Sequence, residues 1–433
     1  MTGASPRQEA PAQIGSGCYI FNGDIDSTCS ESRSGSLRSS DNSGSLSSYA
    51  SAKDAIALTV GRSAHHYLQE CFTTEVSILD REKFDAVPEI VKSDLIIARH
   101  LGKGSYSDVF EVVCEIGDMT RSSDVHRSTR PEGTRPPVRG RRATLTMTAP
   151  SNLSRPAQSS GRRLVLAMKC LRPQIRSDAA KFTVGAEDLV HETAILANLN
   201  HPNIIKLHGR ATGNLADAFV LNDGYFILLD RLKETLHDRI DSWENDPMFS
   251  RNAPNTTQIE VSVSIADAMA YLHSKKIIFR DLKPDNVGFD SLGVVKLFDF
   301  GFAIGMPKND VIYHRCGTPR YMSPEVGIGL GYSLPADVYS FGVLLWEICA
   351  LKKPFGHIVS ADEFEKCVFL EGERPPVGKR WPAIVKELMR SCWSAAPRKR
   401  PTMLDVKSTL SMIQTGNFTD NKKTAMRRRL SLF

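Results

Sequence analysis

The 433-residue chain lacks the features typical of membrane-spanning, secreted and zinc-binding proteins. No apolar run approaches the roughly 18 residues that a membrane-spanning helix needs. The first residues, MTGASPRQEAP, contain no apolar core, so we expect no secretory signal there. The nine cysteines include no Cys-x-x-Cys pair, so neither a zinc site nor a disulfide framework is indicated. These absences favour a reducing compartment, and we expect a cytoplasmic protein, with the nucleus as an alternative.

Apolar residues are also scarce at both ends of the chain. Residues 1–55 are rich in Ser, Gly and Asp, and such a composition buries too little apolar surface to offset its ordering entropy. We therefore expect a disordered Ser-rich tail, which serves either as a linker or as a phosphorylated regulatory segment. Residues 56–93 carry scattered apolar groups, so we expect an N-terminal extension that packs on the domain that follows. Residues 415–433 are polar and basic, which predicts a solvated tail, a phosphorylation site at Ser431 or a short docking motif.

Residues 117–162 lack aromatic side chains and show no helical or strand period. They hold nine Arg and three acidic residues, so their net charge of +6 accounts for the formal charge of the whole chain. The segment is far longer than an ordinary connection between strands, and we expect a basic disordered insertion. Two interpretations stay open, a solvated loop and a surface that binds acidic partners or a membrane surface. No nucleic acid is expected as a partner, because no aromatic residues are available to stack on bases.

The stretch IIFRDLKPDN, residues 277–286, concentrates residues with catalytic chemistry. Asp281 is a carboxylate that can orient a hydroxyl and accept its proton. Lys283 can neutralise a transferring phosphoryl group, and Asn286 can ligate a metal ion. Thirteen residues after Asn286, Asp299 begins an Asp-Phe-Gly sequence and supplies a second metal ligand. Phosphoryl transfer needs this combination, because the reaction depends on positioning and on charge neutralisation.

This ordered set resembles the signature of eukaryotic-type protein kinases. The resemblance covers about residues 94–414 and implies an α+β, two-lobed fold, with a β-rich small lobe containing one key helix and a mainly helical large lobe. It also implies ATP and Mg²⁺ as cofactors. The residues that it assigns to catalysis are Asp281, Lys283, Lys169 and Glu192, and those that it assigns to the metal are Asn286 and Asp299. Lys169 lies in the apolar segment LVLAMKC, and the resemblance pairs it with Glu192, on a predicted helix.

The resemblance also locates the nucleotide pocket. Gly102 and Gly104 lie between two predicted strands and leave room for backbone amides to approach phosphates. The third glycine of the family pattern is replaced here by Ser107. The segment GYFILLDRL reads as a buried strand that ends in a hinge, where Asp230 and Leu232 would offer backbone groups to adenine. The positions expected at the nucleotide are Gly102, Gly104, Val109, Ala167, Lys169, Asp230 and Leu232.

Two positions depart from the family pattern. Phe279 stands where the family usually has a histidine, and we expect its ring to stack near Phe300. Gly288 stands where the family usually has a large apolar residue beneath the adenine. The missing side chain predicts an underfilled pocket floor, which would weaken binding by ~1–2 kcal/mol of apolar burial.

The loop between Gly301 and Thr318 contains no Ser or Thr. In kinases of this pattern an arginine such as Arg280 usually meets a phosphate on this loop. We therefore hypothesise that Asp310 pairs with Arg280 and holds the loop active without phosphorylation; the alternative is a solvated Asp310. Thr318 is expected beside Asp281 and Lys283.

Later motifs complete the resemblance. Glu325, in a Ser-Pro-Glu sequence, would pair with Arg400, and Asp337 would brace the backbone of the catalytic loop. Cys392-Trp393 followed by Arg400-Pro401 resembles the tyrosine-kinase-like group of Ser/Thr kinases. The predicted function is ATP- and Mg²⁺-dependent phosphoryl transfer to Ser or Thr of protein substrates. Alternatives are a nucleotide-binding pseudokinase scaffold and a kinase-fold enzyme that acts on small molecules.

Overall fold

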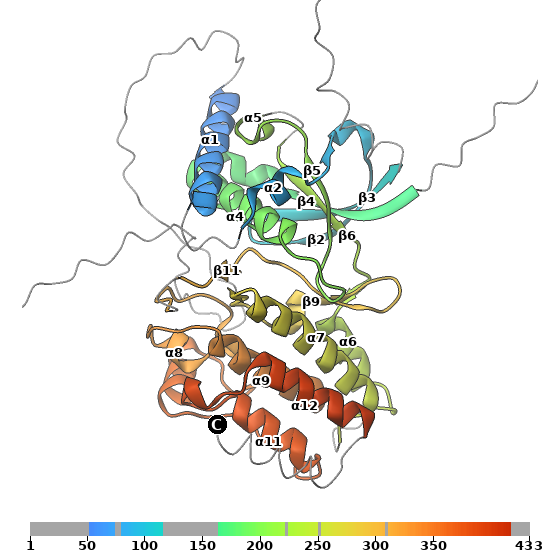
Figure 1. The fold of residues 1–433 in the computed structure, drawn as a ribbon, viewed down its shortest axis with the longest axis vertical. Helices are drawn as coiled ribbons and strands as arrows, with labels where there is room; N and C mark the ends of the chain where they lie inside the picture. The colour runs from blue at the N-terminus through green and yellow to red at the C-terminus, as the bar shows by residue number, and fades with distance from the viewer. Residues whose placement is uncertain are drawn as a thin grey trace, which may run out of the picture.

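The computed structural model describes residues 52–73, 79–115, 163–220, 224–249, 253–307 and 311–416. A β-rich small lobe stands above a mainly helical large lobe, so the expected α+β, two-lobed architecture is confirmed (Figure 1). Most of the expected Ser-rich tail, the basic insertion, Asp310 and the C-terminal tail from residue 417 lie outside the described residues.

The small lobe contains a six-stranded sheet with the strand order β1-β5-β6-β4-β3-β2. Neighbouring strands are antiparallel, apart from β1 and β5, which are parallel. The strands are β1 (Glu89–Ile90), β2 (Ile96–Lys103), β3 (Ser107–Glu115), β4 (Arg163–Leu171), β5 (Leu207–Ala211) and β6 (Phe226–Asp230). In the register of β3 and β4, Glu115 pairs with Arg163, so the chain on either side of the expected insertion belongs to two paired strands.

The small-lobe sheet begins before residue 94, where the sequence analysis placed the start of the kinase domain. Strand β1 has only two residues, which is too short for an alternating pattern to reveal it. Ile90 is buried, and the carboxylate of Glu89 accepts hydrogen bonds from Arg210 and Thr212 of the neighbouring segment. The N-terminal extension therefore supplies an edge strand.

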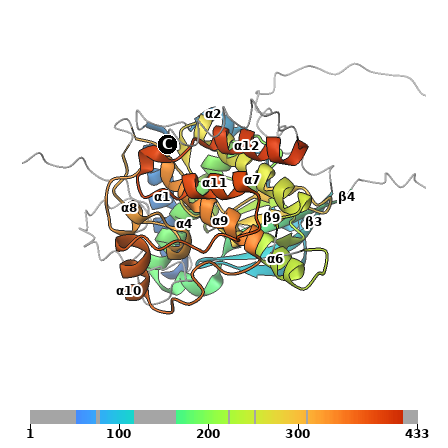
Figure 2. The same cartoon turned by 90° about the horizontal axis from the view of Figure 1, so that it is seen from below.

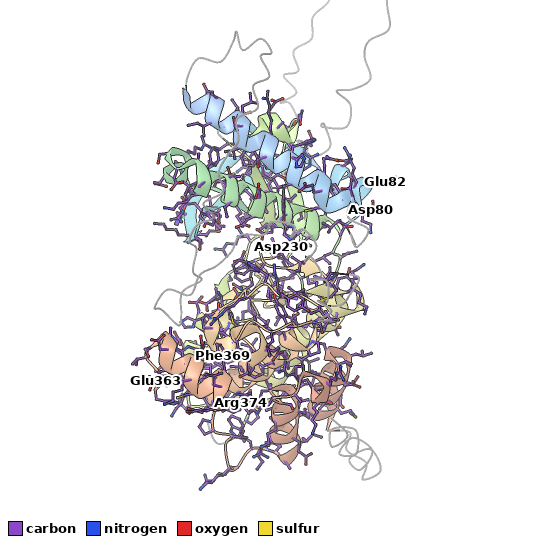
Figure 3. All side chains as sticks on the ribbon, turned by 90° about the vertical axis from the view of Figure 1, so that its left-hand side faces the viewer. Asp80, Glu82, Asp230, Glu363, Phe369 and Arg374 are labelled. Atoms are coloured by element: carbon purple, nitrogen blue, oxygen red, sulfur yellow. The ribbon has the colours of Figure 1, made fainter. Side chains whose placement is uncertain are left out.

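Among the described residues, four helices accompany this sheet: α1 (Ala52–Thr73), α2 (Arg81–Asp85), α4 (Ala179–Ala197) and α5 (Leu215–Ala218). Helix α1 begins at Ala52, inside the segment that its composition assigned to a tail ending at residue 55. It lies along α4 and also contacts α5 (Figures 1 and 3). Asp80, labelled in Figure 3, donates its backbone N–H to the side chain of Asn198 at the end of α4, at 3.0 Å.

The large lobe is built around α9, whose residues from Ala336 to Ala350 are all buried. Helix α9 contacts α11 and α7, and α7 packs against α12 (Figure 2). The helices are α6 (Leu236–Glu244), α7 (Thr256–Ser274), α8 (Pro324–Gly327), α9 (Pro335–Ala350), α10 (Ala361–Phe364), α11 (Ala383–Cys392) and α12 (Met403–Thr415). Reciprocal capping boxes fix the first turns of α6, α7 and α12.

Short strands hold the segments that carry the predicted catalytic residues. They form one three-stranded and one two-stranded sheet, with the orders β10-β9-β7 and β11-β8. The strands are β7 (Glu234–Thr235), β8 (Ile277–Ile278), β9 (Val287–Phe289), β10 (Val295–Leu297) and β11 (Ile304–Gly305). Asp281 and Asn286 therefore lie between β8 and β9, and Asp299 lies between β10 and β11. In the described part of the chain, no helix has the length and apolar character that crossing a membrane requires.

Candidate active site

A cavity of about 660 Å³ lies between the small-lobe sheet and the large lobe. It is lined by the predicted nucleotide-binding residues Gly102, Gly104, Val109, Ala167, Lys169, Asp230 and Leu232, and by Glu192, Asn286 and Asp299. Asp281 and Lys283 adjoin this group. The side-chain amide of Asn286 donates to the backbone oxygen of Asp281 at 2.8 Å, and Lys283 Nζ lies 2.9 Å from an Asp281 carboxylate oxygen.

Lys169 joins both lobes through two carboxylates. Its Nζ lies 2.6 Å from Oε2 of Glu192, on α4, and 3.0 Å from Oδ1 of Asp299. Burial alone would lower the pKa of Lys169, but the charges of Asp299 and Glu192 raise it above its ordinary value. The same attraction to Lys169 lowers the pKa of Asp299. The Asp299 side chain is 49% exposed, so this charged carboxylate also faces the cavity.

Asp281 is buried and held by four hydrogen-bond donors. One carboxylate oxygen accepts from the backbone N–H of Thr318 at 2.9 Å and from its hydroxyl at 2.7 Å. The other lies 3.0 Å from the amide nitrogen of Asn286 and 2.9 Å from Nζ of Lys283. Lys283 also donates to the Thr318 hydroxyl at 2.9 Å. This network fixes the direction of the Asp281 carboxylate and keeps a cation beside it.

The backbone before Asp281 adopts a costly conformation that Asp337 stabilises. Arg280 has a φ of +72°, in the left-handed region that non-glycine residues seldom occupy. The carboxylate of Asp337, in the first turn of α9, accepts from the backbone N–H groups of Phe279 at 2.8 Å and Arg280 at 2.9 Å. The Phe279 ring packs edge-on against Phe300, with centroids 5.1 Å apart. The aromatic replacement of the family's histidine therefore contributes to this packing.

The hinge at Asp230 connects the two lobes (Figure 3). Its carboxylate accepts from His208 Nε2 at 2.8 Å and from the backbone N–H of Lys206 at 3.0 Å. Burial opposes ionisation, but these bonds lower the pKa of Asp230. The backbone N–H of Asp230 donates to the Lys206 carbonyl. An adenine ring in the cavity would therefore have to hydrogen-bond to the Asp230 carbonyl. Within the described residues, the backbone of Leu232 makes no such bond, so both its polar groups can serve a ligand.

The comparison with known families adds a finding independent of this geometry. The model of the protein kinase domain matches residues 156–410, which is more than half of the chain. The chain belongs to the protein kinase family. The matched region contains Lys169, Glu192, Asp281 and Asp299. The glycine loop of this kinase domain precedes the match, and the pairing of β3 with β4 joins the two.

Curated relatives of the kinase domain carry consistent names. A probable serine/threonine-protein kinase of Dictyostelium discoideum is 32% identical over 224 residues, which is 51% of this chain and 13% of the relative. A probable LIM domain-containing serine/threonine-protein kinase of the same organism is 31% identical over 54% of the chain and 34% of its own length. A mitogen-activated protein kinase kinase kinase 7-like protein of Drosophila melanogaster is 31% identical over 51% of the chain and 54% of its own length. The chain thus spans about half the length of these relatives or less.

Sequence reasoning missed several acidic residues that line the kinase pocket, and Asp188 is the one closest to Glu192 along the chain. Asp188 lies one helical turn before Glu192 on α4 and lines the cavity. Burial raises the pKa of its carboxyl to about 7, against the opposing charge of Lys169. The spacing of four residues from Glu192 was the available signal, because it places both side chains on one helical face.

The floor of the kinase pocket differs from the sequence expectation. A Cβ atom at Gly288 would lie 2.7 Å from Cδ1 of Leu232 and 3.3 Å from Cε1 of Phe298. The space beneath the cavity is therefore already filled, and the expectation of an underfilled floor was wrong. Phe298 immediately precedes Asp299, so a bulky residue there occupies the space that Gly288 leaves.

We expect Gly288→Leu to weaken ATP binding by about tenfold, because overpacking a filled site typically costs 1–3 kcal/mol. Phe298→Ala alone should also weaken binding, since it removes part of the floor. Combining the two changes should bring affinity back to within roughly threefold of the parent, because residues in contact are not additive. Calorimetric titration with ATP measures all three, with Val294→Leu, at a partly exposed turn position, as the control. Tighter binding by Gly288→Leu alone would contradict the filled floor.

Proposed function

We propose that this kinase domain transfers the terminal phosphoryl group of ATP, with Mg²⁺, to Ser or Thr hydroxyls of protein substrates. The observation that carries the proposal is the contact of Lys169 with both Glu192 and Asp299 while Thr318 and Lys283 hold Asp281. These contacts require α4, the Asp-Phe-Gly segment and the catalytic loop to be assembled together, as phosphoryl transfer demands. The names of the relatives support the same reaction and acceptor.

The residues at the cavity fit a magnesium–nucleotide complex. Asn286 uses its amide nitrogen on Asp281, which turns its carbonyl oxygen to other partners, and Asp299 presents a charged carboxylate to the cavity. Within the described residues no cluster of three or more His, Cys, Asp or Glu side chains could hold a metal. Two oxygen donors suit Mg²⁺, which usually completes its shell with phosphate and water. When bound, the metal neutralises charge that develops on the phosphates.

Four side chains of the protein would have separate roles in the transfer. Lys169 would orient the nucleotide's phosphates, and Glu192 would keep that lysine in place. Asp281 would orient the acceptor hydroxyl and receive its proton as the oxygen attacks the phosphorus. Lys283, next to Asp281, would balance negative charge on the transferring group. Lys283 within LKPDN is also the basis for preferring Ser or Thr over Tyr as acceptors.

Incubation of the purified chain with labelled ATP, Mg²⁺ and peptide libraries tests this function. We expect label on Ser and Thr peptides, little on Tyr peptides, and no transfer when the metal is chelated. Asp299→Asn should abolish transfer, and Asp362→Asn, at an exposed position in the first turn of α10, provides the matched control. Nucleotide binding without transfer to any peptide would favour the pseudokinase scaffold, and label confined to Tyr would refute the acceptor assignment.

A further inference from the structure

The residues just after the Asp-Phe-Gly sequence are held from two sides. The carbonyl oxygen of Phe302 accepts a hydrogen bond from Nε of Arg280, in the catalytic loop. The carbonyl oxygen of Ala303 lies 2.6 Å from Nε2 of His191, on α4. His191 directly precedes Glu192, whose carboxylate accepts from the backbone N–H of Phe300 at 3.4 Å. Two adjacent residues of α4 therefore contact one short backbone segment.

The hydrogen bonds define the state of His191. A carbonyl oxygen can only accept, so Nε2 carries a proton, and in the neutral imidazole Nδ1 is then an acceptor. The hydroxyl of Tyr67, on α1, lies 3.2 Å from this Nδ1 and donates to it. Burial lowers the pKa of His191, and the nearby charge of Arg280 acts in the same direction, which keeps the imidazole neutral. Burial also raises the pKa of Tyr67, so its hydroxyl keeps the proton that it donates.

Helix α1 is fixed in the position from which Tyr67 reaches His191. One turn before Tyr67, the Ser63 hydroxyl donates to Glu187 at 2.9 Å, one turn before His191 on α4. The two pairs therefore lie along the same face of both helices. On the side of α5, a Cβ atom at Gly61 would lie only 2.1 Å from the carbonyl oxygen of Ala216. Glycine at residue 61 is thus required for the close approach of α1 and α5.

Arg280, for which the sequence hypothesis named Asp310 as partner, makes contacts of its own in the described residues. Its side chain is buried beside Tyr332 and Cys316, and it already binds the Phe302 carbonyl. Asp310, the proposed partner, lies outside the described residues. The pairing with Asp310 therefore stays a prediction, and the described contacts of Phe302 and Ala303 are those with Arg280 and His191.

We propose that Tyr67 and His191 are positioning residues for phosphoryl transfer, through which the N-terminal helix α1 holds α4 and the segment after Asp299 in the active arrangement. This inference rests on the proposed function. The chain of contacts runs from Tyr67 through His191 to the Ala303 carbonyl, and Glu192 and Asp299 lie on the two elements that it joins. If these contacts are lost, α4 and the Asp-Phe-Gly segment can move apart. Lys169 is then separated from the carboxylates of Glu192 and Asp299.

Three substitutions in the full chain test the proposal. Tyr67→Phe removes one hydroxyl and should lower kcat roughly fivefold, the usual worth of one hydrogen bond. His191→Leu removes the donor to the Ala303 carbonyl and the contact with the Tyr67 hydroxyl together, and it should lower kcat on the order of 30-fold. His191→Gln retains an N–H donor and should recover most of that loss. KM for ATP should change less than kcat, because neither residue lines the cavity and both act on the nucleotide only through the contacts of Lys169.

His66→Ala, at an exposed position one residue before Tyr67, is the matched control and should leave kcat unchanged. Hydrogen exchange provides a second measurement that needs no turnover. Amides of residues 299–306 and of the last turns of α4 should exchange faster in Tyr67→Phe and His191→Leu, but not in His66→Ala. Unchanged exchange and kcat in both variants, or losses matched by an equal fall in folded protein, would overturn the inference. A parent chain without transferase activity would instead overturn the proposed function.

Discussion

Asp281→Asn should lower kcat by about a thousandfold, within the range of 10²–10⁴ that general acid–base catalysis contributes. The affinity for ATP should stay within roughly threefold of the parent. The effects on kcat and on ATP affinity should differ because of where Asp281 lies. Asp281 does not line the cavity, whereas Asn286 and Asp299 do. Its removal should therefore affect the acceptor hydroxyl and leave the contacts available to the nucleotide in place.

The substitution also changes the hydrogen bonds around residue 281. The carboxylate accepts from the N–H and hydroxyl of Thr318, from Asn286 and from Lys283. An asparagine offers one acceptor oxygen and directs its NH₂ group at other donors, so one side of the network loses its partner. The side chain can no longer take a proton from the substrate. Both effects act on turnover more strongly than on nucleotide binding.

Single-turnover transfer from labelled ATP measures the chemical step, and calorimetry measures ATP binding. Asp241→Asn, on the exposed surface of α6, controls for the loss of one negative charge. Turnover at the parental level in Asp281→Asn would show that Asp281 is not the base. Loss of ATP binding together with turnover would show that the residue acts mainly by supporting the pocket.

Residues in the catalytic motifs were predictable from the sequence because their spacing along the chain is short. Asp281, Lys283 and Asn286 lie within six residues, and the resemblance then pointed to Lys169 and Glu192. Each of these is also brought to the cavity or beside it. The strands and helices that carry them have strong apolar patterns, which local sequence reports well.

The contacts that the sequence did not reveal depend on residues far apart along the chain. Phe298 and Leu232 both lie next to Gly288 beneath the pocket. The sequence around each of them does not reveal that it fills the space of the missing side chain. Tyr67 reaches His191 across 124 positions, through a helix that begins before the boundary that composition gave to the Ser-rich tail. Such pairings are decided by tertiary packing, so composition and periodicity alone could not place them.

Glu325→Ala should destabilise the large lobe by about 3–5 kcal/mol, the usual cost of leaving one member of a buried ion pair without its partner. Arg400 donates to the two carboxylate oxygens of Glu325 at 2.6 and 2.9 Å. The Arg400 side chain is 0% exposed, so water cannot replace the lost carboxylate. Its remaining bonds, to the carbonyls of Ser394 and Pro335, satisfy hydrogen bonds but do not neutralise its charge.

Urea unfolding of the parent and the variant measures this loss. Asp85→Asn breaks an ion pair with Arg81 whose side chains are 58% and 59% exposed, and it should cost less than about 1 kcal/mol. An equally small loss in Glu325→Ala would contradict the assignment of a strong buried pair. Double replacement of Glu325 and Arg400 by apolar residues should be less damaging than Glu325→Ala, because no uncompensated charge is left inside the lobe.

The pair also predicts a pH dependence with a definite sign. Burial works against ionisation of Glu325, but Arg400 lowers its pKa below the value of an exposed glutamate. A depressed folded-state pKa means that the unfolded chain binds the proton more tightly. The stability that the pair contributes is therefore fully present above the unfolded pKa of about 4.3 and is lost as the pH falls through the folded value. The stability gap between the parent and Glu325→Gln should stay constant from about pH 6 to 8 and narrow below about pH 4; a gap that widens on acidification would contradict the lowered pKa.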